Sequence, residues 1–135
     1  MLDERTSSAA ALPPGVFAVI PAYNEGAALA DVVAALVPRV GCVVVIDDGS
    51  RDDTAGIASA AGATVLRHPV NLGQGAALQT GIEYSLAAGA RYIVTFDADG
   101  QHDPDDLQHM IAALERTGAE AALGSRFLEG ASTNA

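Results

Sequence analysis

Residues 42–54 read Cys-Val-Val-Val-Ile-Asp-Asp-Gly-Ser-Arg-Asp-Asp-Thr, and this stretch decides the fold. Its first five residues are apolar and do not alternate with polar ones, which predicts a strand that is buried on both faces. Such a strand belongs inside a parallel sheet that is covered by helices on each side. The polar residues 47–54 then follow the carboxyl end of a strand, where folds of this kind bind their ligands.

Further apolar runs alternate with helical patterns along the rest of the chain. Strands are predicted at residues 16–20, 64–66, 92–96 and 121–123. Helices are predicted from apolar stripes at Leu29, Val32, Val33 and Leu36, at Ile57 and Ala61, at Leu78, Ile82 and Leu86, and at Leu107, Met110, Ile111 and Leu114. Regular alternation of strand and helix predicts an α/β fold, Rossmann-like, with a mainly parallel sheet, right-handed crossovers and helices on both faces.

The length of 135 residues fits one domain. We expect residues 1–15, which are rich in Ser, Ala and Pro, to be a mobile leader, residues 16–127 to form the domain, and residues 128–135 to be a tail. The N-terminus lacks the basic region and apolar core of a signal peptide, and no apolar run reaches the ~18 residues of a membrane span. These features predict a cytoplasmic protein, with peripheral contact to the inner face of the membrane left open.

The composition limits the partners that the protein can have. A net charge of −10 argues against a nucleic-acid binder, because such proteins carry a basic surface. The same charge would repel phosphate groups, so a phosphate site here needs a metal ion or helix N-termini. The single cysteine, Cys42, lies in an apolar run and is expected to be a buried, reduced thiol.

Two acids spaced one residue apart follow the predicted strand at 92–96. Asp97 and Asp99 precede Gly100 and Gln101, so a turn can aim both carboxylates at one point beyond the edge of the sheet. Carboxylate and amide oxygens suit a hard cation such as Mg²⁺ or Mn²⁺. The alternative is that these acids only shape a turn, as Asp103 is expected to do for the next helix by acting as its N-cap.

Several phosphate-binding patterns do not fit. A dinucleotide fingerprint should directly follow the first strand, where only Gly26 is present, and Gly73-Gln74-Gly75 lacks the third glycine. The chain contains no lysine, which excludes a P-loop. An EF-hand requires its glycine at the sixth loop position, whereas Gly100 is fourth from Asp97. A phosphatase that uses Asp-x-Asp as nucleophile and acid remains as an enzymatic rival.

Five loops, taken in order, resemble the family 2 glycosyltransferases of the GT-A fold. They are Pro21-Ala22-Tyr23-Asn24-Glu25, Asp47-Asp48-Gly49-Ser50-Arg51-Asp52-Asp53-Thr54, Asn71-Leu72-Gly73-x-Gly75-x-Ala77, Asp97-Ala98-Asp99-Gly100-Gln101-His102 and Gly124-Ser125-Arg126-Phe127. The fourth and fifth loops look most like the polyprenyl-phosphate branch that includes dolichyl-phosphate mannosyltransferase. The resemblance covers residues 16 to about 130.

The resemblance implies a nucleoside pocket at the first two loops. Pro21, Tyr23 and Glu25 would line it, with Tyr23 giving an aromatic face and Glu25 accepting a hydrogen bond from a hydroxyl or a base N–H. Ile46 and Asp48 would close the other side of the base, with Asp48 accepting a ring N–H. The donor would be a UDP- or GDP-sugar.

The resemblance also implies a diphosphate and metal site. Asp97, Ala98 and Asp99 would bracket the ribose and diphosphate, while Asp97, Asp99 and Gln101 would hold Mg²⁺ or Mn²⁺. Arg126 would reach the phosphates or the acceptor through its planar guanidinium group. Asp99 and Arg126 are the residues expected to act in catalysis.

Each of these roles has a structural alternative. Tyr23 can be a half-exposed loop aromatic, and Asp47 and Asp52 can be turn and cap residues. His102 can hydrogen-bond within its own loop, and Arg126 can pair with a surface acid. The sequence alone leaves these alternatives open.

The implied reaction is an inverting displacement at the anomeric carbon of the sugar. His68 and His109 have no companions that suggest catalysis, and no general base is visible. A polyprenyl phosphate acceptor would need none, because a phosphate monoester is already largely ionised near neutral pH.

The acceptor-binding sequence expected after the Gly-Ser-Arg-Phe loop is missing, so we expect a C-terminally truncated, donor-binding part of the fold. The alternatives are a non-catalytic nucleotide-sugar-binding module or one half of a split enzyme. An edge strand at 121–123 would favour association with a second copy or a complementing chain.

Overall fold

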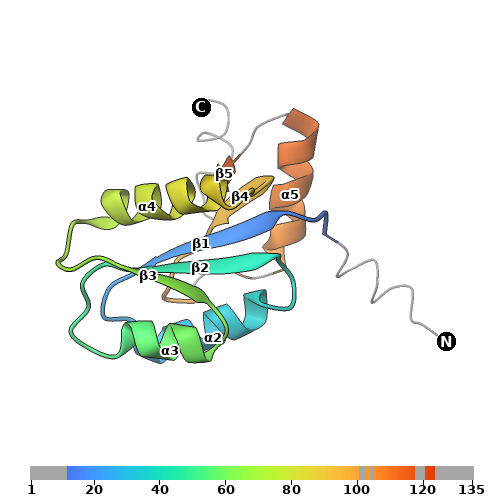
Figure 1. The fold of residues 1–135 in the computed structure, drawn as a ribbon. Coiled ribbons are helices and arrows are strands. Elements are labelled where there is room, and N and C mark those ends of the chain that lie inside the picture. The colour runs from blue at the N-terminus through green and yellow to red at the C-terminus, as the bar shows by residue number, and fades with distance from the viewer. Residues whose placement is uncertain (1–11, 101–102, 104, 118–120, 124–135) are drawn as a thin grey trace.

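The computed structural model describes residues 12–100, 103, 105–117 and 121–123. Its centre is a parallel sheet with the strand order β3-β2-β1-β4-β5 (Figure 1). The strands are β1 (Val16–Ala22), β2 (Cys42–Asp47), β3 (Thr64–Arg67), β4 (Tyr92–Thr95) and β5 (Ala121–Leu123). The helices are α2 (Gly26–Leu36), α3 (Thr54–Ala60), α4 (Gln74–Ala87) and α5 (Asp106–Thr117). The predicted α/β alternation is confirmed.

Helices cover both faces of the sheet, as the unbroken apolar strands predict. Figure 1 shows α4 on one side of the sheet and α2 and α3 on the other. One set of β1 side chains, including Ala18 and Ile20, packs in a core cluster with residues of α2, α3 and α5. The intervening residue Val19 packs with Val44, Ile46 and the α4 helix in a second cluster. The alternation of side chains along β1 therefore supplies both cores.

Strand β1 runs two residues further than the sequence predicts, through Pro21 to Ala22. The carbonyl of Val19 accepts the N–H of Phe96 at 3.0 Å, so the backbone of Val19 faces β4. Pro21, two residues later, faces the same side, where the β1–β4 pairing has already ended at Val19 and Thr95. A proline is tolerated there because no ladder hydrogen bond needs its missing N–H.

The centre of the buried face of helix α4 differs from the one predicted. The residues it buries are Ala77, Gly81 and Ser85, whereas Leu86 is 56% exposed. A Cβ atom on Gly81 would lie 2.5 Å from both Ile46 Cδ1 and Val19 Cγ1, so the helix sits too close to the sheet for larger residues. The predicted stripe of Leu78, Ile82 and Leu86 is confirmed in part, because Leu78 and Ile82 are partly buried against the second cluster while Leu86 is exposed.

Helix α5 begins at Asp106, slightly later than predicted. A turn precedes it, in which the Asp103 carboxylate accepts the N–H of Asp105 and the Asp103 carbonyl accepts the N–H of Asp106, both at 2.9 Å. Asp103 thus shapes the approach to the helix, and Pro104 lies outside the described residues. The predicted apolar face is confirmed, since Leu107, Met110, Ile111 and Leu114 are all buried.

The strand order determines where a ligand can bind. The chain passes from β1 to β2 on one side and from β4 to β5 on the other, so the order reverses between β1 and β4. In open parallel sheets, ligands bind beyond the carboxyl ends of the strands at such a switch point. The polar loops that the sequence singles out after β1, β2 and β4 lie at this edge.

Candidate functional site

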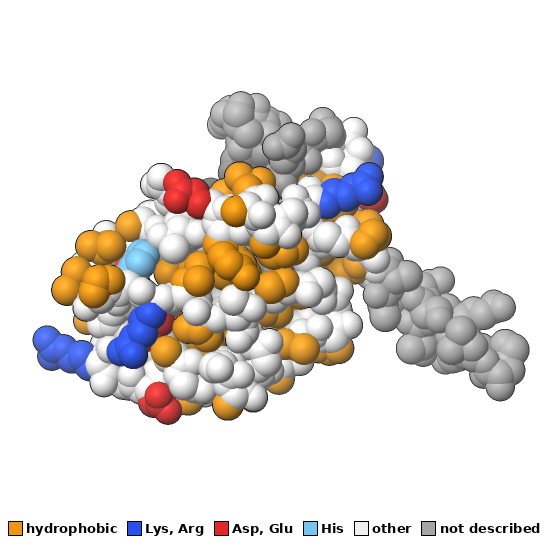
Figure 2. Space-filling model, viewed as in Figure 1, with side chains coloured by type: hydrophobic (Ala, Val, Ile, Leu, Met, Phe, Trp, Pro, Cys, Tyr) orange, Lys and Arg blue, Asp and Glu red, His pale blue; other side chains and the backbone are white. Residues whose placement is uncertain are grey.

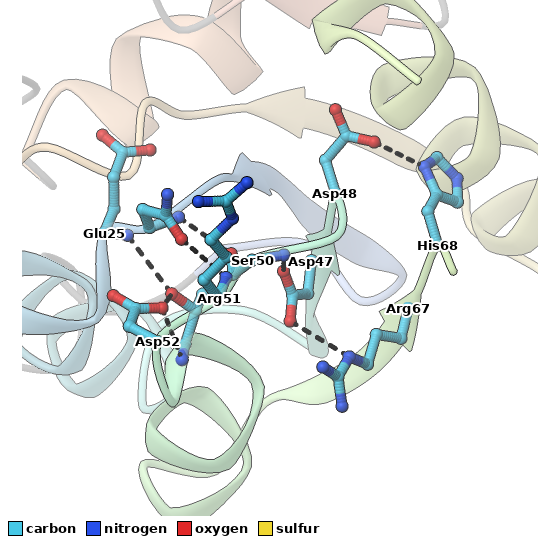
Figure 3. Close-up of polar contacts among 10 residues, drawn as sticks. Glu25, Asp47, Asp48, Ser50, Arg51, Asp52, Arg67 and His68 are labelled. Carbon is cyan, nitrogen blue, oxygen red and sulfur yellow. Dashed lines mark hydrogen bonds and ion pairs between the residues drawn. The ribbon is translucent and has the colours of Figure 1, made fainter. Parts of the chain in front are cut away.

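The loops after β1 and β2 are joined by reciprocal hydrogen bonds (Figure 3). Asn24 donates its backbone N–H to Ser50 Oγ at 2.8 Å, and its side-chain Oδ1 accepts the N–H of Arg51 at 2.8 Å. The Glu25 N–H donates to Thr54 Oγ1 at 3.2 Å. Asn24 has φ of 54°, a left-handed conformation that asparagine tolerates better than most residues. These three hydrogen bonds hold the loop after β1 against the loop after β2.

Asp52 organises the start of α3. One of its carboxylate oxygens accepts both the N–H of Thr54, at 3.0 Å, and the Thr54 hydroxyl. The other oxygen accepts the N–H of Gly26 at 3.4 Å. The hydrogen bond from the Thr54 hydroxyl is the main cause that lowers the pKa of Asp52, against a smaller opposing effect of burial. Asp52 therefore has the contacts of a turn and cap residue.

Asp47 is fully buried at the end of β2. Its Oδ1 accepts the N–H of Ser50 at 2.9 Å, which closes the turn after the strand. Its Oδ2 lies 3.4 Å from Arg67 Nε but has no hydrogen bond of good geometry. Asp47 therefore forms an ion pair with Arg67 and stabilises the turn that follows β2.

Asp48 lies one residue further and is held by the loop between β3 and α4. Its Oδ1 accepts the N–H of Leu72 at 2.9 Å and lies 2.8 Å from His68 Nδ1, while its Oδ2 accepts the N–H of Gly73 at 2.9 Å. Burial alone would raise the pKa of Asp48, but hydrogen bonds from Leu72, His68 and Gly73 outweigh it and leave the pKa below its usual value. Asp48 is therefore kept ionised although only 4% of it is exposed.

Gly49 allows the loop after β2 to contact the loop between β3 and α4. Its φ is 80°, and a Cβ atom there would lie 2.6 Å from the carbonyl carbon of Val70. Any other residue would push the two loops apart. Beside this contact the surface has an open hollow of about 330 Å³, lined by Gly49, Ser50, Arg67, His68 and Pro69.

Three further carboxylates gather near the switch point. Burial raises the pKa of Glu25, and the negative charges of Asp99 and Asp97 raise it further, against a hydrogen bond from the Tyr23 N–H that lowers it. Glu25 is therefore within electrostatic reach of the two acids that follow β4. Within the described residues, no group of three or more His, Cys, Asp or Glu side chains is arranged to enclose a metal ion.

Positive charge also reaches this region. Figure 3 shows the Arg51 side chain extending into the space between Glu25 and Asp48. Arg51 is exposed and its backbone is fixed by Asn24. A guanidinium group among carboxylates can attract the phosphate groups of a ligand that the acids alone would repel.

The structure places the remaining candidate residues as follows. Tyr23 is 41% exposed at the loop after β1, and Pro21 is half-buried within the strand. The side chains of Ile46 and Ala98 are buried in the two core clusters, so they face the core. Gln101 and Arg126 lie outside the described residues, as do residues 1–11 of the leader and 128–135 of the tail.

Three residues of this edge were given no role from the sequence: Arg51, His68 and Thr80. For His68 the sequence suggested no companions, whereas the structure gives it two. His68 directly follows β3 and is only 10% exposed at its side chain, between Asp48 and Thr80. The available signal was its position, because a polar residue right after a parallel strand lies at the same edge as the other loops. Its two partners are 20 and 12 residues away in sequence, so no local pattern reveals them.

The glycosyl transferase family 2 model matches residues 17–135, which is most of the chain. The chain belongs to glycosyl transferase family 2. It is 33% identical over 130 residues to UDP-N-acetylglucosamine–dolichyl-phosphate N-acetylglucosaminyltransferase of Methanococcus voltae, covering 83% of this chain and 52% of that protein. It is 34% identical over 121 residues to polyprenol monophosphomannose synthase of Mycolicibacterium smegmatis, covering 83% of this chain and 45% of that protein.

A solved glycosyltransferase structure shares the fold. Glucosyl-3-phosphoglycerate synthase from Mycobacterium tuberculosis, in complex with Mn²⁺, UDP and glucosyl-3-phosphoglycerate, matches with a TM-score of 0.63 and 32% identity. The match covers 78% of this chain and 41% of that one. Another structure of that enzyme contains Mg²⁺ and UDP. The predicted GT-A fold and membership of family 2 are confirmed.

The family 2 chain spans about half the length of the relatives it matches, 52% and 45% in the two cases above. Within the part of the chain that the structure describes, no helix is both long and apolar enough to cross a membrane.

Proposed function

We propose that this family 2 chain binds a nucleoside diphosphate sugar, a UDP- or GDP-sugar, at the carboxyl edge of its sheet. The observation that carries the proposal is the convergence at the β1–β4 switch point, where Glu25 is within electrostatic reach of Asp97 and Asp99 and Arg51 lies between Glu25 and Asp48. The structurally similar glucosyl-3-phosphoglycerate synthase has been solved with UDP together with Mn²⁺ or Mg²⁺, which supports the same class of ligand here.

The nucleoside would bind against the joined loops after β1 and β2. Tyr23, whose side chain is exposed at this edge, would present its ring to the base. Glu25 and Asp48 would accept hydrogen bonds from the nucleoside, and Pro21 and Ile46 would contribute through the backbone and shape of β1 and β2. Asp97, Ala98 and Asp99 would border the ribose and diphosphate.

The residues present fit a hard divalent cation, Mg²⁺ or Mn²⁺, in their donor chemistry. Asp97 and Asp99 offer carboxylate oxygens. The pKa of nearby Glu25 is raised mainly by burial and, to a smaller extent, by the negative charges of Asp99 and Asp97, which a cation would neutralise. Asp97, Asp99 and Gln101 would hold the ion, which when bound supplies charge stabilisation for the leaving diphosphate. Arg126 would contact the phosphates or the acceptor.

We further propose that the protein transfers the sugar, with inversion, to a polyprenyl phosphate of the dolichyl type. Two relatives are named for transfer to such lipids. The described residues at this edge include no histidine that is free to act as a general base, since His68 is held by Asp48 and Thr80. An ionised phosphate acceptor needs no such base. A lipid acceptor would bring the protein to the inner face of the membrane as a peripheral protein.

Calorimetric titration tests the donor site. UDP and GDP are titrated with Mn²⁺, with Mg²⁺ and with a chelator, into the wild type and into Asp99→Ala. We expect metal-dependent binding of one of them to the wild type and loss of that binding in Asp99→Ala. Asp31→Ala, which removes an exposed acid of α2, is the matched control and should bind like the wild type.

Absence of binding under every condition would sink the donor-site proposal. Binding that depends neither on the metal nor on Asp99 would support the nucleotide site but contradict the proposed metal site. Sugar release from the bound donor, measured with and without polyprenyl phosphate, then separates a transferase from a module that only binds.

A further inference from the structure

We propose that His68 is a positioning residue that, together with Thr80, orients the Asp48 carboxylate toward the nucleobase and so sets the preference for bases with a ring N–H. This inference rests on the proposed donor site. It concerns two residues that do not themselves contact the nucleotide, and it predicts an effect on selectivity among nucleotides.

The geometry is a continuous chain of three side chains. His68 Nδ1 lies 2.8 Å from Asp48 Oδ1, and His68 Nε2 lies 2.8 Å from Thr80 Oγ1. The side chains of His68 and Asp48 are only 10% and 5% exposed, so solvent does not compete strongly for these bonds. Asp48 belongs to the loop after β2 and Thr80 to helix α4, so His68 links the site to a rigid element.

The partners fix which nitrogen of a neutral His68 carries the proton. An ionised carboxylate can only accept, so Nδ1 must donate to Asp48. Nε2 is then an acceptor, and the Thr80 hydroxyl donates to it. Thr80 therefore holds the imidazole in the tautomer that serves Asp48. The lowered pKa of Asp48 is consistent with a carboxylate that stays ionised and accepting.

The hydrogen bonds of Asp48 leave one position open. Oδ1 already accepts from His68 and from the Leu72 N–H, whereas Oδ2 accepts only from the Gly73 N–H. Since a carboxylate oxygen has two acceptor positions, Oδ2 can take one more donor. Figure 3 shows this second oxygen pointing away from His68.

An acceptor in this position discriminates between bases. Uracil and guanine present a ring N–H at the edge that pairs, while cytosine and adenine present a ring nitrogen lone pair there. A fixed carboxylate favours the first pair and repels the second, but a carboxylate that can rotate loses part of this discrimination. His68, held by Thr80, restricts that rotation together with the backbone N–H groups of Leu72 and Gly73.

The test measures affinity for UDP, GDP, CDP and ADP by calorimetry in the presence of Mn²⁺. His68→Gln puts its amide near the position of Nε2 and removes the donor to Asp48, whereas His68→Asn keeps an N–H near the position of Nδ1. Thr80→Val removes the hydroxyl at nearly constant volume. Val70→Ala, on the same loop and 59% exposed, is the control.

We expect His68→Gln to reduce the preference of the wild type for its keto-base nucleotide over CDP or ADP by about tenfold, the effect of one hydrogen bond to a charged group. Thr80→Val should reduce it less, and His68→Asn and Val70→Ala should retain it. An equal loss of affinity for all four nucleotides in His68→Gln would overturn the proposal while leaving the donor site standing. No binding of any nucleotide to the wild type would overturn both.

A second measurement needs no variant. Nitrogen chemical shifts of the His68 ring in the wild-type protein report which nitrogen is protonated. A proton on Nδ1 supports the proposal. A neutral ring with its proton on Nε2 would overturn it, because His68 would then offer Asp48 a lone pair.

Discussion

Asp47 and Asp48 are neighbours in the chain, yet their carboxylates have different partners. The buried carboxylate of Asp47 closes a turn through Ser50 and lies beside Arg67. That of Asp48 accepts from Leu72, Gly73 and His68 on another loop. The alternation of side chains at the end of β2 separates the two acids, so the first contacts the turn after β2 and the second contacts the loop between β3 and α4.

The pKa of Asp48 predicts how acid affects stability. Because the folded-state pKa is lowered, the contribution of Asp48 is fully present above the ordinary aspartate pKa of about 3.9 and is lost as the pH falls through the lower folded-state value. Asp48→Asn should cost about 1–3 kcal/mol of unfolding free energy near neutral pH, since its hydrogen bonds are charge-assisted. The difference from the wild type should shrink toward low pH.

Urea unfolding at a series of pH values measures this difference. Asp31→Asn, which removes an exposed acid of α2, serves as the matched control. A constant gap between Asp48→Asn and the wild type from neutral to acidic pH would contradict the role that we assign to the ionised carboxylate.

Among the elements, helix α4 shows what an apolar pattern can and cannot predict. The existence of the helix and its end at Gly89 followed from the sequence, and the structure confirms the end: the N–H of Ala90 reaches the carbonyl of Ser85 and that of Gly89 reaches Leu86. The buried face did not follow, because the stripe of Ala77, Gly81 and Ser85 is defined by small size. The distance between a helix and a sheet depends on the side chains of both, so the sequence of the helix alone does not predict it.

The two glycines of α4 give a matched test of this packing. Gly81→Ala adds a methyl group 2.5 Å from Ile46 and Val19, and overpacking of this kind costs roughly 1–3 kcal/mol. Alanine gains about 1 kcal/mol of helix propensity over glycine, so we expect a net loss of stability of about 1 kcal/mol. Gly75→Ala, where a Cβ meets nothing within 4 Å, should instead gain up to about 1 kcal/mol.

Chemical unfolding of both variants decides between these outcomes. Stabilisation of similar size in Gly81→Ala and Gly75→Ala would show that α4 can move away from the sheet at little cost. The close packing at Gly81 would then not limit the choice of residue.

The sequence predicted some features of the candidate site and missed others. The loops after β1, β2 and β4 were predictable because parallel strands bring their carboxyl ends together, and Glu25 does lie within electrostatic reach of Asp97 and Asp99. The link from Asp48 through His68 to Thr80 was not, because it joins three elements by side-chain geometry alone. The ligand-binding roles of all the candidate residues stay predictions, and Gln101 and Arg126 also lie outside the described residues.

Across the whole molecule, charge is distributed unevenly. The chain carries −10 in total, yet basic side chains and a histidine lie close to exposed hydrophobic side chains on the face seen in Figure 2. Exposed hydrophobic residues near the site include Val70 and Leu72, which are 59% and 55% exposed on the loop that holds Asp48. The surface around this edge is therefore less acidic and more hydrophobic than the net charge of the chain suggests.

Self-association is the last property that we predict at this scale. Among the described residues, β5 ends the sheet and pairs only with β4, so its outer backbone groups can pair with another chain. Copies that each carry −10 repel one another, and salt weakens this repulsion because the Debye length falls from about 10 Å at 0.1 M to about 3 Å at 1 M. We therefore expect sedimentation velocity to show more dimer at higher salt and at higher protein concentration. A single monomeric species across that whole range would contradict association through β5, and dimers that dissociate as salt is added would indicate a contact between opposite charges instead.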